Sequence, residues 1–415
     1  MKRDIKSTIL KTLNNERACA LIGPRQVGKS YILKEIIKDL KGNYITLDDP
    51  IIREEIKKDP VDYLRRFYFH NQYLFIDEPA KVPHIFDAIK ILIDEKEGSP
   101  SKICIANSGN YLFLRKVKES LAGRVSILSL LPFSWNELSN VNKFCGLFEL
   151  LNSNTAMPQN VDHTHINRLR SKMLVWGGYP VPTLASNRDS QIRWIRDSLI
   201  TYVFPILIEQ FQIRNLDAFE KFVRLIFIQS SSLLNKQKLA NSIGVSQPTV
   251  NNYLYQLKAM MLVITLEVYH RNPGKRLVKQ NKIHAIDPLL IHNALNTNFS
   301  NERAKELQFY GKIYESFIVT ELHKILYNSG AIFDAYYWRT QDGAEVDLIL
   351  EIKGKVLAFE IKSSPKINRR DVSGLISFLS DHPYVENGYI IYPGREIQFI
   401  NDKVIAIPDW WLLGC

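Results

Sequence analysis

The chain has 415 residues, 46% of them hydrophobic and 23% charged, which excludes a largely disordered protein. This length exceeds what one hydrophobic core usually spans, so we expect two to four domains. The formal charge of +11 is concentrated between Asp162 and Glu306, a stretch that contains nineteen Lys/Arg and ten Asp/Glu. This basic excess suggests an anionic partner, with nucleic acid as the first candidate. The alternative is a basic surface without a specific partner.

The first residues are polar, and no segment has about 18 uninterrupted apolar residues. We therefore expect a cytoplasmic protein without a membrane partner. The four cysteines show no Cys-x-x-Cys spacing, which argues against a structural zinc site or a disulfide framework.

A phosphate-binding loop is predicted near the N-terminus. An apolar run over 18–22 reads as a buried strand, and a helix-like stretch with Ile32, Leu33 and Ile36 on one face follows the loop. The segment between them fits G-x-x-x-x-G-K-[ST] in full, in the strand-to-helix setting that this motif requires. Its residues are Gly23, Pro24, Arg25, Gln26, Val27, Gly28, Lys29 and Ser30.

Each residue type in this loop suits a phosphate ligand. The glycines allow backbone N–H groups to wrap the phosphates, and the helix N-terminus adds a favourable dipole. Lys29 should reach the β- and γ-phosphates, and the Ser30 hydroxyl should ligate Mg²⁺. The alternative is a glycine-rich turn that binds no ligand.

A second apolar strand, over 73–77, ends in two acids. Asp77 is expected to help hold Mg²⁺, and Glu78 can polarise the attacking water as the catalytic base. Further strands over 43–49, 102–106 and 125–130 alternate with helices, which predicts a parallel sheet with the ligand beyond the carboxyl ends of its strands. A guanine-selecting Asn-Lys-x-Asp is absent, because Asn142 and Lys143 are followed by Phe144 and Cys145, so we expect ATP.

Further segments make the chain resemble a family of bacterial and archaeal AAA ATPases whose C-terminal domain of unknown function has a restriction-endonuclease-like core. The carrying segments are residues 23–30, Ile76-Asp77-Glu78, Ser120-Leu121-Ala122-Gly123-Arg124-Val125, Pro132-Phe133-Ser134, Gly177-Gly178-Tyr179-Pro180 and Phe359-Glu360-Ile361-Lys362. They span nearly the whole chain. The Leu-Ala-Gly-Arg and Gly-Gly-Tyr-Pro segments are the more particular ones.

The sequence departs from the family pattern twice. Ala80 stands where a Gln commonly follows the acidic pair, and Ala106-Asn107-Ser108-Gly109 replaces the usual Thr-Gly-Ser strand end. The resemblance implies a polar sensor at this strand end, so Ser108 or Asn107 is the candidate; the alternative is an ordinary strand-to-loop turn.

The same resemblance makes Arg124 the candidate arginine finger. AAA proteins place such a group on the γ-phosphate across a subunit boundary, which implies a homo-oligomer. A structural salt bridge is the equal alternative.

The middle of the chain carries helix-turn-helix signals. We expect helices over 234–243 and 247–257 with Gly244 in the turn, Ser246 as the N-cap and Pro248 in the first turn. Strands over 262–268 and 282–286 would flank a wing from Arg271 to Lys282 that has five basic residues and no acid. Such a wing would contact phosphates, DNA before RNA; the alternative is a solvated hairpin on a protein-interaction module.

The last third holds a second charged group of residues. Strand-like runs over 345–350 and 356–362 meet at Lys353 and Gly354. If these two residues form the turn, Asp347 lies opposite Glu360, and one face buries every large apolar residue except Ile349.

That charged face resembles the Asp…Glu-x-Lys core of restriction endonucleases, preceded by a helix over 310–326 that bears Glu315. Asp347 and Glu360 would hold Mg²⁺, and Lys362 would help to activate water or stabilise the charge of the phosphorane. The alternative is a degenerate nuclease fold retained for binding or assembly.

These observations predict an α/β chain of four parts. They are a parallel-sheet P-loop domain of the AAA type over 1–160, a helical lid over 161–215, a winged helix-turn-helix over 216–300 and a restriction-endonuclease-like α/β domain over 301–415. The predicted function is ATP hydrolysis coupled to nucleic-acid binding. The rival is a nucleotide-dependent switch that binds protein partners and cleaves nothing.

Overall fold

The computed structural model of the chain describes residues 2–40, 42–68, 73–95, 102–108, 111–139, 145–158, 161–198, 213, 215–270 and 280–414. It divides into two compact units. The N-terminal unit comprises Met1–Pro132, Ala259–Met261 and Tyr327–Gly330; the C-terminal unit comprises Phe133–Lys258, Leu262–Leu326 and Ala331–Cys415. In the described ranges, every helix is too short or too polar to span a bilayer.

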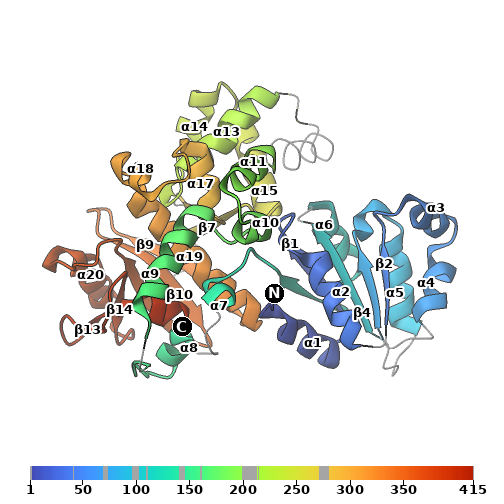
Figure 1. Cartoon of the computed structure of the whole chain (residues 1–415), viewed down its shortest axis with the longest axis horizontal. Coiled ribbons are helices and arrows are strands. Elements are labelled where there is room, and N and C mark those ends of the chain that lie inside the picture. Colours follow the sequence, from blue (N-terminus) through green and yellow to red (C-terminus); the bar gives the residue numbers. More distant parts are fainter. Residues whose placement is uncertain are drawn as a thin grey trace. The chain divides into compact units, whose positions relative to one another are not determined.

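The N-terminal unit is built on a parallel five-stranded sheet, as the sequence predicts (Figure 1). The strand order is β2-β3-β4-β1-β5. Strand β1 is buried along its whole length, which is typical of a strand covered on both faces of the sheet. The strands are β1 (Ala18–Gly23), β2 (Gly42–Thr46), β3 (Tyr73–Asp77), β4 (Lys102–Ser108) and β5 (Val125–Ser129).

Amphipathic helices connect these strands and bury their apolar faces against the sheet. In α5, for example, Ile85, Ile89 and Leu92 lie in one core cluster with the strand residues Leu74 and Ile103. The helices are α1 (Ile5–Asn15), α2 (Lys29–Asp39), α3 (Pro50–Lys58), α4 (Pro60–Tyr68), α5 (Ile85–Glu95) and α6 (Tyr111–Ser120), with the short 3-10 helix η1 (Pro79–Lys81).

The C-terminal unit begins with short helices whose ends are fixed by side chains. Ser134 and Glu137 form a reciprocal cap at the start of α7, because each side chain accepts from the other residue's backbone N–H. The region predicted as a lid contains helices up to residue 198, and 199–212 lie outside the described residues. The helices are α7 (Trp135–Ser139), α8 (Gly146–Leu151), α9 (His163–Trp176), α10 (Pro180–Leu184) and α11 (Arg188–Ser198).

The Gly-Gly-Tyr-Pro segment joins distant parts of this unit. A Cβ on Gly177, whose φ is +60°, would lie 1.6 Å from Asp287 Oδ1, and a Cβ on Gly178 would lie 2.1 Å from the Phe133 carbonyl oxygen. Gly178 N donates to Asp287 Oδ2 at 2.8 Å, and Phe133 N donates to the Gly178 carbonyl at 2.7 Å. Both glycines are therefore required by close packing.

The helix-turn-helix elements form near the predicted positions. Ser246 Oγ accepts from Thr249 N, and Gly244 adopts a φ of +70° after the first helix, as their predicted roles require. The first helix begins at Lys236 instead of Leu234, because Asn235 caps it through Lys238 N. The elements are α13 (Leu216–Ile228), β6 (Ser232–Leu233), α14 (Lys236–Ile243), α15 (Gln247–Ala259), β7 (Val263–Val268) and β8 (Lys282–Ala285).

The hairpin strands continue into the C-terminal sheet. The nine-stranded sheet has the order β13-β14-β12-β11-β10-β9-β7-β8-β6, and the parallel pair of β7 with β9 joins its two parts. One sheet thus crosses the predicted boundary at residue 300. The remaining strands are β9 (Phe333–Arg339), β10 (Glu345–Ile352), β11 (Lys355–Ile361), β12 (Gly388–Tyr392), β13 (Gln398–Phe399) and β14 (Val404–Pro408).

The β10–β11 hairpin has the predicted register. Ile352 pairs with Lys355 and Leu348 with Phe359, and the two turn residues have φ of 50° and 78°. The expectation for Ile349 is wrong, because Ile349 is also buried, in a cluster with Leu375 and Phe378 of α20. The helices of this region are α17 (Pro288–Leu295), α18 (Asn301–Glu306), α19 (Tyr310–Ser329), η3 (Arg369–Val372), α20 (Ser373–Asp381) and α21 (Asp409–Leu413).

Candidate nucleotide site and the charged cluster of the C-terminal unit

The loop over 23–30 connects β1 to α2 as predicted, and two of its glycines are required by the backbone. A Cβ on Gly23 would lie 2.0 Å from the Leu130 carbonyl oxygen, so only glycine fits beside the end of β5. Gly28 has a φ of 94° at the N-cap of α2. Backbone N–H groups at the start of α2 lack partners within the helix and can bind an anion.

Lys29 lies within this loop. Its Nζ donates to the carbonyl oxygens of Pro24 at 2.7 Å and Gly23 at 3.1 Å. Burial lowers the pKa of Lys29 to about 8, while the nearby Glu78 and Asp77 oppose this shift. A phosphate would add strong negative charge beside this ammonium and favour its charged form.

Asp77 ends β3 with one of its carboxylate oxygens unpaired. Oδ2 accepts from the Tyr44 hydroxyl at 2.7 Å, whereas Oδ1 is buried without a hydrogen-bond partner in the described part of the chain. Tyr44 also interacts with Ser30, so the two expected Mg²⁺ residues lie around one tyrosine. A hard cation fits here, because Oδ1 and the Ser30 hydroxyl are oxygen ligands.

Glu78 follows directly, in a left-handed backbone conformation with φ 56°. Its Oε1 accepts from Ser108 Oγ at 2.7 Å and from Ser108 N at 3.1 Å. Burial raises the pKa of Glu78, and the Ser108 hydroxyl and Lys29 oppose the increase. Asn107 instead accepts from Ala80 N and stabilises the turn after Glu78, so Ser108 is the sensor candidate that reaches the acidic pair.

Arg124 lies away from its own loop. It precedes β5, and Val125 pairs with Ala18, the residue at the amino end of β1, whereas the loop follows the carboxyl end. Its guanidinium makes two hydrogen bonds to Asp94, with Nε to Oδ1 at 2.7 Å and Nη2 to Oδ2 at 3.0 Å. Arg124 thus forms the salt bridge considered from the sequence, and a finger role would require a second subunit.

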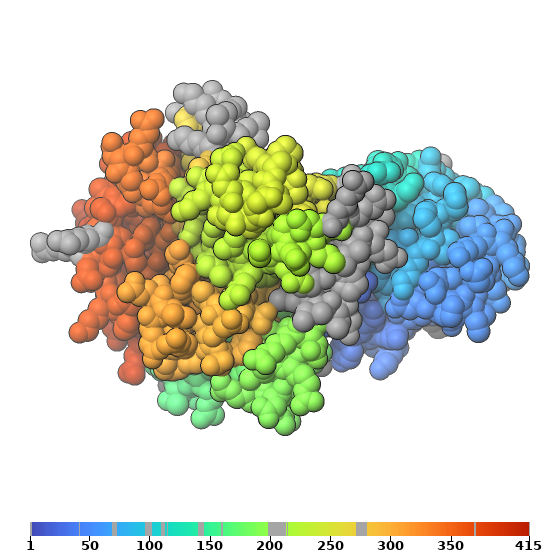
Figure 2. All heavy atoms as spheres, turned by 90° about the horizontal axis from the view of Figure 1, so that it is seen from above, coloured from blue at the N-terminus to red at the C-terminus, as the bar shows by residue number. Residues whose placement is uncertain are grey.

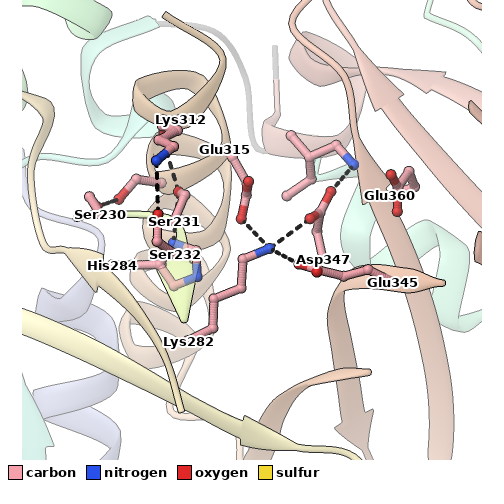
Figure 3. Close-up of polar contacts among 12 residues, drawn as sticks. Ser230, Ser231, Ser232, Lys282, His284, Lys312, Glu315, Glu345, Asp347 and Glu360 are labelled. Atoms are coloured by element: carbon pink, nitrogen blue, oxygen red, sulfur yellow. Dashed lines mark hydrogen bonds and ion pairs between the residues drawn. The ribbon is translucent and has the colours of Figure 1, made fainter. Parts of the chain in front are cut away.

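The C-terminal unit contains a buried charged cluster around Lys282 (Figure 3). Lys282 Nζ lies 2.7 Å from Glu315 Oε1, 2.7 Å from Glu345 Oε1 and 2.8 Å from Asp347 Oδ1. Burial disfavours the charged form of Lys282, but Asp347, Glu315 and Glu345 outweigh it and raise its pKa. We call Lys282, Glu315, Glu345 and Asp347 the Lys282 cluster.

Glu360 and Lys362 lie beside this cluster. Lys362 Nζ donates to Glu360 Oε1 at 2.7 Å, and Glu360 Oε2 is buried without a hydrogen-bond partner among the described residues. Burial, followed by the charge of Asp347, raises the pKa of Glu360 to about 8. Burial and Asp347 likewise raise the pKa of Glu315 to about 8. The structure thus places the carboxyl groups of Glu315, Asp347 and Glu360 close together.

The structure bears on two expectations here. Lys282 does not belong to a phosphate-contacting wing, because its side chain is 3% exposed and binds three carboxylates; Arg271 to Lys279 lie outside the described residues. At the metal site expected from Asp347 and Glu360, Lys282 Nζ donates to Asp347 Oδ1 and Ile361 N donates to Asp347 Oδ2, and metal binding there stays a prediction from the sequence. No described group of three or more His, Cys, Asp or Glu side chains is arranged to hold a metal ion.

Comparison with protein families agrees with the geometry of the nucleotide site. The family described as an AAA domain matches residues 15–139, which include the loop, Asp77, Glu78 and Ser108. We call residues 15–139 the AAA domain after this match. After this AAA domain, the domain of unknown function DUF8612 matches residues 167–301, and the domain of unknown function DUF4143 matches residues 310–411.

Whole-chain relatives are similar over nearly the full length. Uncharacterized proteins of Mycobacterium bovis and Mycobacterium tuberculosis are 27% identical over 412 residues, which is 98% of this chain and 83% of each relative. Among solved structures, the Walker-type ATPase of Pyrococcus abyssi has 14% identity and a TM-score of 0.46, covering 71% of this chain and 95% of its own. A katanin self-assembly structure has 14% identity and a TM-score of 0.27, covering 48% and 69%.

Two site residues escape sequence reasoning. Tyr44, whose hydroxyl binds Asp77 in the AAA domain, lies in an ordinary strand pattern with no motif around it. Lys282 reads as the last basic residue of the wing, although an isolated lysine that begins an apolar strand is a weak signal of an internal partner. The ion pairs in the structure show which acids it meets.

Proposed function

We propose that the AAA domain binds ATP with Mg²⁺ and hydrolyses it. The observation that carries this proposal is the unpaired, buried Oδ1 of Asp77, next to a base and beside an intact phosphate loop. Lys29 would exchange its two loop carbonyls for phosphate oxygens, and Ser30 with Asp77 would hold the cation. Mg²⁺, when bound, neutralises charge on the β- and γ-phosphates.

Glu78 is the proposed base that orients the attacking water. Ser108 binds Oε1 and leaves Oε2 to accept from water, so the carboxylate keeps one orientation. The raised pKa of Glu78 makes it a stronger proton acceptor than an exposed carboxylate. Both features favour hydrolysis of ATP over nucleotide binding without turnover.

Phosphate release tests this function. Lys29→Ala should weaken nucleotide binding, whereas Glu78→Gln should retain ATP and lower turnover by about 10²-fold or more. Glu55→Gln, at an exposed site on α3, is the control for an acid-to-amide change. Unchanged turnover in Glu78→Gln would refute the assignment of the base.

A second proposal is that α15 contacts nucleic acid, DNA before RNA. The helix exposes Gln247, Asn251 and Asn252, whose amides can pair with base edges, and the α13–α15 segment reaches the outer surface of its unit (Figure 2, yellow-green). Asn251→Ala should weaken duplex binding about fivefold or more, while the exposed Ser380→Ala should not. Equal affinities for both variants would refute this role.

The rival function, a nucleotide switch for protein partners, predicts different kinetics. An ATPase acting on nucleic acid should turn over repeatedly and faster with DNA or RNA present, whereas a switch should retain its nucleotide and hydrolyse it slowly. Turnover with and without nucleic acid separates the two. Nuclease activity is not part of the proposal, because Lys282 Nζ and Ile361 N already donate to both oxygens of Asp347, the expected metal ligand.

A further inference from the structure

The Lys282 cluster matches the bonding capacity of one ammonium group. A lysine ammonium has three N–H donors, and three carboxylates from α19 and β10 lie 2.7–2.8 Å from its nitrogen. All three are ion-pair distances, and those to Glu345 and Asp347 are also hydrogen bonds. The cluster is thus organised around nitrogen.

The second carboxylate oxygens of Asp347 and Glu345 also have partners. Asp347 Oδ2 accepts from Ile361 N at 2.9 Å, and Glu345 Oε2 accepts from Arg339 at 3.0 Å. Lys282 comes from β8, so its position depends on the sheet formed by β7, β8 and β9 and not on the carboxylate hairpin itself. The position of the Lys282 ammonium group is therefore set by the fold.

We propose that Lys282 is a built-in cation that replaces a divalent metal in the C-terminal unit. It pairs with three clustered carboxyl groups, joins β8 to α19 and β10, and closes the acidic cluster without an ion from solution. This C-terminal unit then binds or assembles and does not perform metal-dependent cleavage. The inference is independent of ATP hydrolysis, because every residue involved lies outside the AAA domain.

Manganese binding, measured by the electron paramagnetic resonance of free Mn²⁺, tests this proposal. All proteins carry Asp77→Asn and are free of nucleotide, so that the nucleotide site of the AAA domain contributes no Mn²⁺ binding. With Lys282 intact, the protein should bind no Mn²⁺ at millimolar concentration. Lys282→Met should bind one Mn²⁺ with a dissociation constant at least about tenfold below that millimolar limit, since the competing ammonium is gone.

Two further variants serve as controls. Lys282→Arg keeps the charge and should not gain Mn²⁺ binding, and adding Asp347→Asn to Lys282→Met should abolish the gained site. Thermal unfolding gives a second readout: Lys282→Met should be destabilised in chelator and recover with Mn²⁺, whereas the intact protein should respond to neither.

Two outcomes would overturn the proposal. One is a single Mn²⁺ bound with Lys282 intact and lost in Asp347→Asn, a result that does not depend on whether any Lys282 variant folds. The other is a folded Lys282→Met protein that binds no Mn²⁺. In that case the carboxylates have no affinity for a metal, and Lys282 cannot be said to replace one.

Discussion

Ser108 donates its hydroxyl to Glu78 Oε1 at 2.7 Å, across the carboxyl ends of β4 and β3. Its backbone N–H reaches the same oxygen at 3.1 Å. The proposed base is therefore held by Ser108, one of the two sensor candidates, and Ser108 is a positioning residue.

Ser108→Ala should lower kcat about tenfold while leaving KM for ATP nearly unchanged, because orientation of the base is lost and the phosphate loop is intact. The hydroxyl lowers the pKa of Glu78, so its removal should raise that pKa and move the acid limb of the kcat profile to higher pH. Steady-state phosphate release across pH measures both effects. Ser108→Thr should restore the profile; an unshifted limb in Ser108→Ala would argue against the contact.

Variants of Arg124 and Asp94 distinguish an arginine-finger role of Arg124 from a structural salt bridge. If Arg124 acts across a subunit boundary, Arg124→Ala should lower ATP turnover about 10³-fold, whereas Asp94→Asn, which removes the same salt bridge, should leave turnover high. Mixing Arg124→Ala with Glu78→Gln protein should restore part of the activity. Equal turnover for the two single variants, with no rescue on mixing, would assign Arg124 to the salt bridge alone.

The buried pair of Arg170 and Asp409 should contribute strongly to stability. Arg170 makes two hydrogen bonds of 2.6 Å to Asp409, which also accepts from the Tyr314 hydroxyl. Arg170→Ala should lower the free energy of unfolding by about 3–5 kcal/mol, because it leaves a buried carboxylate without its cation. The exposed Arg168→Ala on the same helix is the control for urea unfolding. A cost as small as that of Arg168→Ala would contradict this prediction.

Asp287 should make stability depend on pH. Burial raises its pKa from 3.8 to about 6, so the folded state retains a proton that the unfolded state releases. The contribution of Asp287 to the free energy of unfolding is therefore most favourable below pH 3.8. It falls by on the order of 2–3 kcal/mol as the pH rises to 6. The difference in free energy of unfolding between wild type and Asp287→Asn, measured from pH 4 to 7, should shrink accordingly. A constant difference would contradict the shift.

The wing remains a prediction from sequence. Charge reversal of Lys275 and Arg276 should lower the salt slope of DNA binding by roughly one unit for each phosphate that these side chains no longer neutralise. Fluorescence anisotropy at several salt concentrations measures the slope. Lys11→Glu, on α1, is the control for charge alone, and an unchanged slope in the double reversal would exclude phosphate binding by these residues.

Local signals predict much of the nucleotide site and one hairpin. Gly23, Lys29 and Asp77 belong to motifs whose geometry is fixed by neighbouring residues, and the register of β10 with β11 follows from a two-residue turn. Arg124 and Lys282 could not be placed, because their partners come from distant elements. The expectation for Ile349 fails for the same reason, since α20 covers its face.

The parallel pair of β7 with β9 bears on where the chain can be divided. Glu267 and Val268 pair with Tyr336 and Tyr337, so a fragment that ends near residue 300 would expose an unpaired strand edge. The complementary fragment would retain Glu315, Glu345 and Asp347 without Lys282, leaving three crowded carboxyl groups without their cation. Each fragment is then prone to aggregate or unfold, and the two halves of the sheet are expected to fold only as one chain.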